Sequence, residues 1–153
     1  MKKFLGIFVG ILMVALVSGC GTKEKTMTCT KETIDGENYK TTDTLEITYN
    51  SKSVLRVKNT TISETDAELM DFSLGIMKAF GMAFDEVNGI TVDVNQVDDN
   101  KVKIETNINY AEVNLDNLHE KLGSLVDDDS YYSSTNVTID QFKETHLEGY
   151  TCK

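Results

Sequence analysis

Hydrophobic and polar residues alternate with a period of two in several stretches of the chain, most clearly over residues 101–110. This alternation is typical of a β-strand with one buried face. Residues 90–97 alternate in the same way, and Asp98-Asp99-Asn100 between the two stretches predicts a turn. The two stretches therefore predict a β-hairpin.

Three earlier stretches alternate more weakly and are separated by turn residues. Residues 25–34 are rich in threonine, and the Asp35-Gly36 dipeptide that follows is favoured in tight hairpins. Residues 38–49 form the second stretch, and residues 53–62 form the third, after a turn at Asn50-Ser51-Lys52. The three stretches predict an antiparallel meander.

Three further stretches repeat their hydrophobic residues every three or four positions, which is typical of α-helices. The longest, 66–87, starts in a capping pattern at Thr65-Asp66-Ala67-Glu68, and shorter helices are expected at 114–126 and 139–148. Gly149 suits the C-cap of the last helix. The order of elements predicts an α+β domain, in which the long helix and the two shorter C-terminal helices pack on one face of an antiparallel sheet of about five strands.

The long predicted helix has apolar residues on two sides. One stripe contains Phe72, Ile76, Phe80, Ala83 and Val87, and the other contains Met70, Leu74, Met77 and Phe84. Two stripes exceed the usual amphipathic arc, so this helix requires contact on both sides. Methionine and aromatic side chains pack well in a core, and they also line adaptable binding grooves. These side chains can therefore pack in the core, or they can form an apolar binding surface, which is the more specific hypothesis. The candidate residues for such a surface are Met70, Met77, Phe80 and Phe84.

The first residues of the chain follow a different pattern. Lys2 and Lys3 precede an apolar run over residues 4–17, and Val17-Ser18-Gly19-Cys20 closes the run. The run is shorter than the ~20 residues that a membrane-spanning helix needs, so it predicts the core of a signal peptide. The residues before Cys20 resemble the lipobox of bacterial lipoproteins, in which the cysteine thiol carries a diacylglycerol. An uncut signal anchor and a protein cleaved elsewhere are the alternatives.

This lipobox resemblance implies a division of the chain into three parts. Residues 1–19 are the expected signal peptide, residues 20–26 the lipidated cysteine with a short tether, and residues 27–153 a single extracytoplasmic domain. Each buried methylene of an acyl chain contributes about 0.8 kcal/mol, so Cys20 would hold the protein on the outer face of the cell membrane. The chain has no proline, which argues against a long proline-rich stalk.

The charge of the chain restricts its partners. Two of the 15 basic residues lie in the predicted signal peptide, whereas all 25 acidic residues follow it, so 13 basic residues remain and the formal charge is −12. Such a surface repels nucleic acid and anionic lipid headgroups. We therefore expect membrane lipid to be bound through acylated Cys20 alone, and we expect no nucleic acid as a partner.

Cys29 and Cys152 lie near opposite ends of the expected domain, in a compartment that permits disulfides. A structural disulfide between them is the favoured prediction, and Tyr150-Thr151-Cys152 would then fold back towards Cys29. Two buried free thiols are the first alternative. A catalytic thiol is the second, although neither cysteine has a neighbouring histidine or a Cys-x-x-Cys partner.

The sequence lacks the motifs that are typical of enzymes and cofactor sites. His119 and His146 have no second ligand at metal spacing, and the acidic segments at 98–100 and 127–130 lack the calcium-loop pattern. There is no nucleophile elbow, phosphate-binding loop or dinucleotide fingerprint. We expect no catalytic activity, no metal and no cofactor.

Three features carry a resemblance to a known family at the level of layout: the lipobox ending in Cys20, the threonine-rich strand around Thr28-Cys29-Thr30, and the terminal Gly149-Tyr150-Thr151-Cys152-Lys153. The chain resembles the small uncharacterised lipoproteins of bacteria such as Firmicutes, and among them the domain-of-unknown-function family thirteen-oh-seven. The resemblance covers nearly the whole chain after Cys20. It implies a fold and a location at the membrane, with no catalytic residues.

Two functional hypotheses follow from these predictions. The first is a non-catalytic, membrane-anchored binding or accessory module that uses the long helix to bind an apolar ligand or a protein partner. The second is a surface protein with a structural role that self-associates through the same helix.

Overall fold

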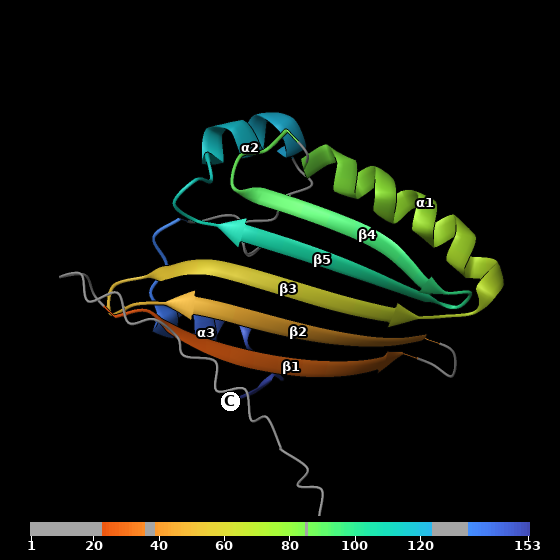
Figure 1. Ribbon diagram of the computed structural model, residues 1–153, viewed down its shortest axis with the longest axis horizontal. Helices are drawn as coiled ribbons and strands as arrows, with labels where there is room; N and C mark the ends of the chain where they lie inside the picture. The colour runs from red at the N-terminus through yellow and green to blue at the C-terminus, as the bar shows by residue number, and fades with distance from the viewer. Residues whose placement is uncertain (1–22, 36–38, 85, 124–134) are drawn as a thin grey trace, which may run out of the picture.

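The computed structural model of the protein describes residues 23–35, 39–84, 86–123 and 135–153. A twisted sheet runs through the molecule, and three helices lie beside it (Figure 1). In chain order the elements are β1 (Lys25–Asp35), β2 (Tyr39–Tyr49), β3 (Val54–Glu64), α1 (Ala67–Phe84), β4 (Ile90–Asp98), β5 (Lys101–Asn109), α2 (Leu115–Leu122), α3 (Ile139–His146) and β6 (Thr151–Cys152).

The sheet has six strands in the order β4-β5-β3-β2-β1-β6, and all neighbours are antiparallel. The α+β prediction is therefore confirmed, together with the meander of β1, β2 and β3 and the hairpin of β4 and β5. The expected number of about five strands is one too low, because β6 also pairs with β1. A strand of two residues is too short to show a period of two, so alternation cannot reveal it.

The helices are shorter than predicted. α1 ends at Phe84 rather than at Val87, and Val87 instead donates its backbone N–H to the carbonyl of Phe84 in a turn. α2 ends at Leu122, where Gly123 follows with a positive φ of 50°. Glycine adopts that conformation without steric cost, which explains the stop. Residues 124–126, the rest of the predicted helix, lie outside the described residues.

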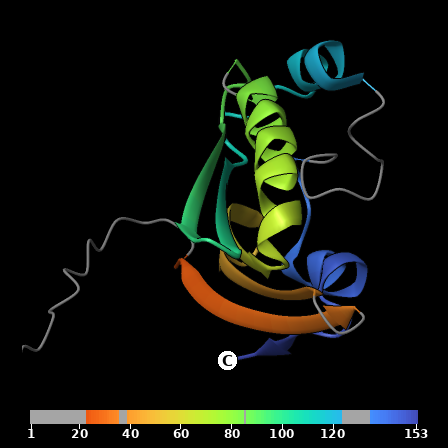
Figure 2. The same cartoon turned by 90° about the vertical axis from the view of Figure 1, so that its right-hand side faces the viewer.

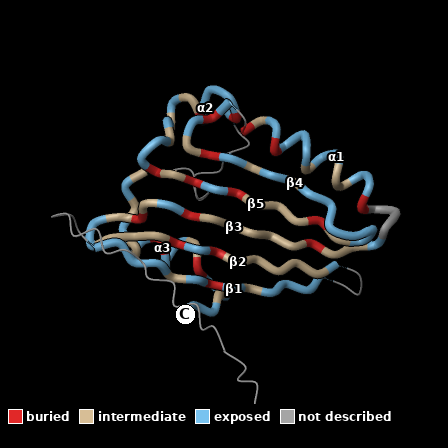
Figure 3. The backbone as a smooth tube through the Cα atoms, in the orientation of Figure 1, coloured by how far each residue is buried: buried red, intermediate tan, exposed pale blue. Residues whose placement is uncertain are grey.

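One face of the sheet forms the floor of the core. A row of apolar side chains crosses five strands at a single register level: Met27, Ile47, Val57, Ile108 and Ile90. Phe84 of α1, Leu118 of α2 and Phe142 of α3 are fully buried members of the same cluster. Buried positions recur along the central strands in Figure 3. Each helix therefore contributes at least one large side chain to one shared core.

The three helices lie on the same side of the curved sheet (Figure 2). α1 packs on β4, and Gly81 lets the helix approach the side chains of Val92 and Val94 closely. α3 begins at a capping box in which the Thr138 hydroxyl accepts from the Gln141 backbone and the Gln141 side chain accepts from the Thr138 N–H. This placement leaves the opposite face of the sheet without a helix.

Candidate functional site

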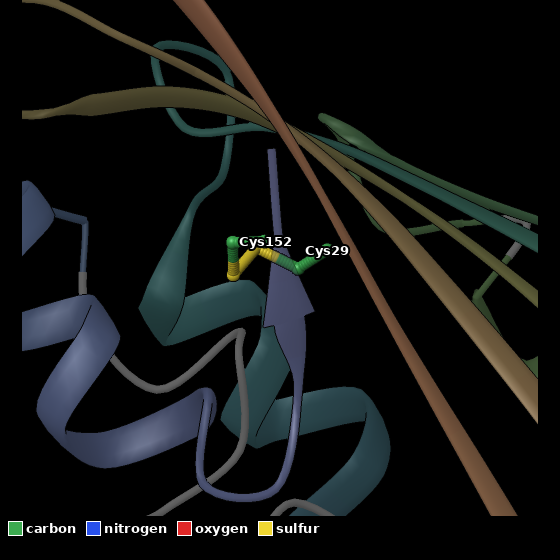
Figure 4. The surroundings of a disulfide bond; sticks show 2 residues. All are labelled: Cys29 and Cys152. Atoms are coloured by element: carbon green, nitrogen blue, oxygen red, sulfur yellow. A yellow bond between two sulfur atoms is a disulfide. The ribbon is translucent and has the colours of Figure 1, made fainter.

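The structure joins Cys29 in β1 to Cys152 in β6, with an S–S distance of 2.05 Å (Figure 4). The two cysteines are register partners in the sheet, so their side chains meet across neighbouring strands. Thr28 and Lys153 add two backbone hydrogen bonds, of 3.2 and 2.9 Å. The C-terminal end of the chain is thus fastened to the first strand.

Cys20, the predicted lipidation site, lies outside the described residues. The described chain starts at Lys23, and β1 begins at Lys25, inside the stretch 20–26 that was expected to be a tether. The Glu24 carboxylate pairs with the Arg56 guanidinium of β3 at 2.6 Å. Only a few residues therefore separate Cys20 from the sheet.

The four residues of the predicted apolar surface do not share an exposed face. Met70 and Phe84 are buried, with 1% and 0% of their surface accessible. Met77 is half-buried, while Phe80 is 42% exposed and its ring packs edge-on against that of Phe84 at 5.1 Å. Met70 and Phe84 therefore serve packing, and Phe80 alone of the four is largely accessible.

A different set of apolar side chains on α1 is exposed. Phe72, Ile76 and Phe80 are four residues apart and lie on one side of the helix, with 72%, 56% and 42% of their surface accessible. Met82, at 63%, lies near the end of the same helix. We call Phe72, Ile76 and Phe80 the α1 stripe, and Met82 is not part of it because two residues along a helix are separated by roughly 160° around its axis. The sequence does contain the signal for this stripe, since its three residues belong to the first of the two apolar stripes of the predicted helix.

The side of α1 that faces the solvent carries few charges. Among its described residues that are exposed, only Asp71 and Lys78 are charged. No basic residue lies in its last turn. Close to its C-terminal end, Glu86 pairs with Lys121 of α2, and this contact lowers the pKa of the Glu86 carboxyl and raises that of the Lys121 amine. The α1 stripe is thus an apolar strip with little charge of its own.

Ion pairs within and between strands cover the face of the sheet that has no helix. The Glu105 carboxylate lies 2.6 Å from the Lys103 amine and 3.2 Å from that of Lys58, and hydrogen bonds from both lower its pKa. Lys101 pairs with Glu64 at 3.2 Å. This face therefore neutralises most of its own charge.

The formal charge is divided unevenly between the long strands and the rest of the chain. The five long strands contain seven basic and eight acidic residues, a formal charge of −1. From Lys23 onward, the rest of the chain contains six basic and seventeen acidic residues, a formal charge of −11. Among the residues whose side chains are described, the helices and the segments beside them (65–89, 110–123 and 135–150) contain nine acidic and three basic residues, a formal charge of −6.

The surface has two depressions relevant to binding. One, of about 450 Å³, lies on the ion-paired face of the sheet and is lined mainly by polar residues, among them Arg56 and Asn107. The other, of about 350 Å³, lies between α1 and β4, where Met82 and Lys78 border Val92. The second depression therefore lies on the side of α1 that faces β4, and none of Phe72, Ile76 and Phe80 lines it.

Within the described part of the chain, no group of three or more His, Cys, Asp or Glu residues is placed to hold a metal ion. His119 is exposed, and the His146 ring lies 4.8 Å from that of Phe142. The acidic turn at Asp98-Asp99 is exposed, whereas residues 127–130 lie outside the described residues. No described helix is long and apolar enough to cross a membrane.

Comparison with known proteins identifies the fold. No protein-family model matches the chain, and no curated protein does. The fold is similar to the NMR structure of the YehR protein of E. coli, with a TM-score of 0.63 and 14% identity over 86% of this chain and 92% of that one. It is also similar to the NMR structure of a protein from Streptococcus pneumoniae TIGR4, with a TM-score of 0.54 and 12% identity over 100% of this chain and 98% of that one.

Proposed function

We propose that this protein is a lipoprotein, anchored by acylated Cys20 on the outer face of the cell membrane, that acts as a non-catalytic binding or accessory module. The α1 stripe carries the binding part of the proposal. Fully burying a side chain such as Phe72 or Ile76 contributes about 1.5–3 kcal/mol. Their exposure leaves that free energy to a binding partner.

Two observations support the membrane anchor. The sequence before Cys20 has the basic start, short apolar core and small residues of a lipoprotein signal peptide. The disulfide between Cys29 and Cys152 suits a compartment outside the cytoplasm. A tether of only a few residues would keep the domain, and with it α1, close to the bilayer.

The anchor is tested by mass spectrometry of the N-terminal peptide of the protein purified from its own membranes. The proposal predicts a peptide that starts at Cys20 and carries a diacylglycerol. Cys20→Ala serves as the comparison, and it should shift the protein out of the membrane fraction or leave it unprocessed. An unmodified Cys20 in the mature protein, or equal membrane retention of the variant, would overturn the anchor.

A further inference from the structure

The α1 stripe forms a continuous apolar line over more than two helical turns. Phe72, Ile76 and Phe80 follow one another at intervals of four residues, so their side chains lie on one side of α1. A row of bulky side chains with this spacing matches the way in which an amphipathic helix is bound along its length.

The surroundings of the stripe determine the charge of its partner. The described side chains of α1, α2, α3 and the segments beside them carry a formal charge of −6. The C-terminal end of α1 adds the negative end of the helix dipole, and its last turn has no basic residue to offset that end. A positively charged partner is therefore attracted to this side of the molecule.

The same charges argue against two other occupants. A second copy of this chain would bring its own acidic helical side against the first, and like charges oppose such a contact. Helices that lie on membranes carry lysine and arginine on their polar side, whereas Lys78 is the only basic residue of α1. An apolar surface within an acidic layer is complementary to a cationic, apolar polypeptide.

We propose that the α1 stripe is the docking surface for a cationic amphipathic helix of another protein. This inference rests on the proposed binding function and names the chemical class of the partner. Apolar residues of the partner cover Phe72, Ile76 and Phe80. Its lysine and arginine residues interact with the acidic residues of the helical layer.

The test uses the full-length lipidated protein in nanodiscs of neutral phosphatidylcholine, with empty nanodiscs as the blank. The probe is a synthetic helical peptide with leucine on one side and lysine on the other. Two matched peptides replace leucine by serine or lysine by glutamate. Titration calorimetry at physiological ionic strength should show binding of the leucine/lysine peptide and at least about tenfold weaker binding of the other two.

Variants of the protein locate the binding. Phe72→Ser combined with Ile76→Ser should weaken binding of the leucine/lysine peptide at least about tenfold, with an unchanged melting temperature because both side chains are exposed. Ile34→Ser is the matched control, since Ile34 is 70% exposed in β1, on the face of the sheet opposite α1. It should leave binding unchanged.

Several results would overturn the inference. Equal binding of the serine/lysine peptide means attraction by charge alone, and equal binding by the double variant places the contact elsewhere. Stripe-dependent attraction to anionic phosphatidylglycerol nanodiscs identifies a membrane contact instead, and stripe-dependent dimerisation identifies a second copy. These results leave the lipid on Cys20 untouched, so the proposed anchor and the proposed partner fail separately.

Discussion

Replacing Cys152 by alanine should cost the protein a large part of its stability. The disulfide joins residues 123 positions apart and so closes a loop of most of the folded chain. The chain-entropy model assigns about 5 kcal/mol to a loop of this length, and removal of native disulfides typically costs about 2–5 kcal/mol. Whole domains are stable by only about 5–15 kcal/mol, so the expected loss is easily measured.

Cys152 is the better choice for this substitution because it is exposed, whereas Cys29 is fully buried. The variant leaves the Cys29 thiol in the core as a small apolar group, so the loss comes mainly from the longer unfolded loop. Urea unfolding of the oxidised protein, the reduced protein and the Cys152→Ala variant gives the comparison. The reduced protein and the Cys152→Ala variant should share one urea midpoint, which is lower than that of the oxidised protein. Adding reductant should not shift the midpoint of the variant.

Equal midpoints for the oxidised protein and the Cys152→Ala variant would contradict this reasoning. So would two alkylatable thiols in the native protein, because they would mean that the ends of the domain are not joined. If the variant does not fold, stepwise reduction of the native protein at fixed urea concentrations supplies the same free energy.

Three further predictions concern the core, a turn and a surface ion pair. Phe84→Ala should destabilise the domain by about 3–5 kcal/mol because Phe84 is fully buried, whereas Phe72→Ala should change the urea midpoint little; equal losses would refute the assignment of faces on α1. Gly89→Ala should lower the free energy of unfolding by more than about 2 kcal/mol in the same assay, since Gly89 has a φ of 81° and an added Cβ would lie 2.6 Å from the Val113 backbone nitrogen. A variant as stable as the wild type would contradict this backbone conformation at Gly89. Glu105→Gln should lower the free energy of unfolding at pH 7, because the two lysines stabilise only the carboxylate. The difference from the wild type should disappear as the pH falls below the ordinary carboxyl pKa of 4.5 and then through the lowered pKa of the folded state. A difference in free energy that persists at pH 2 would refute this ion-pair explanation.

The sequence predicts most of the sheet because its buried face imposes a period of two. In β5 the positions of Val102, Thr106 and Ile108 are buried, and these are the alternate residues of the predicted strand. β6 has no such pattern, since only the disulfide and its pairing with β1 define it. The capping box of α3 is visible in the sequence as Thr138 followed by Gln141, although it was not among the predicted features.

The candidate site was harder to predict. Periodicity reveals that α1 has two apolar stripes, but it does not tell which one contacts the sheet. That choice depends on close packing between Gly81 and β4, which turns Met70 and Phe84 inward and Phe72 outward. Tertiary packing of this kind involves strands distant in sequence, so local patterns do not contain it.

On the proposed function, the α1 stripe is the contact surface of a membrane-anchored binding module. Site-specific photo-crosslinking in the native membrane tests it most directly, with a photoreactive phenylalanine analogue in place of Ile76 or, as the control, of Ile34. We expect cross-links from position 76, and not from position 34, to a lysine- and arginine-rich apolar segment of another protein, identified by mass spectrometry. No polypeptide cross-link from position 76, or the same products from both positions, would contradict it.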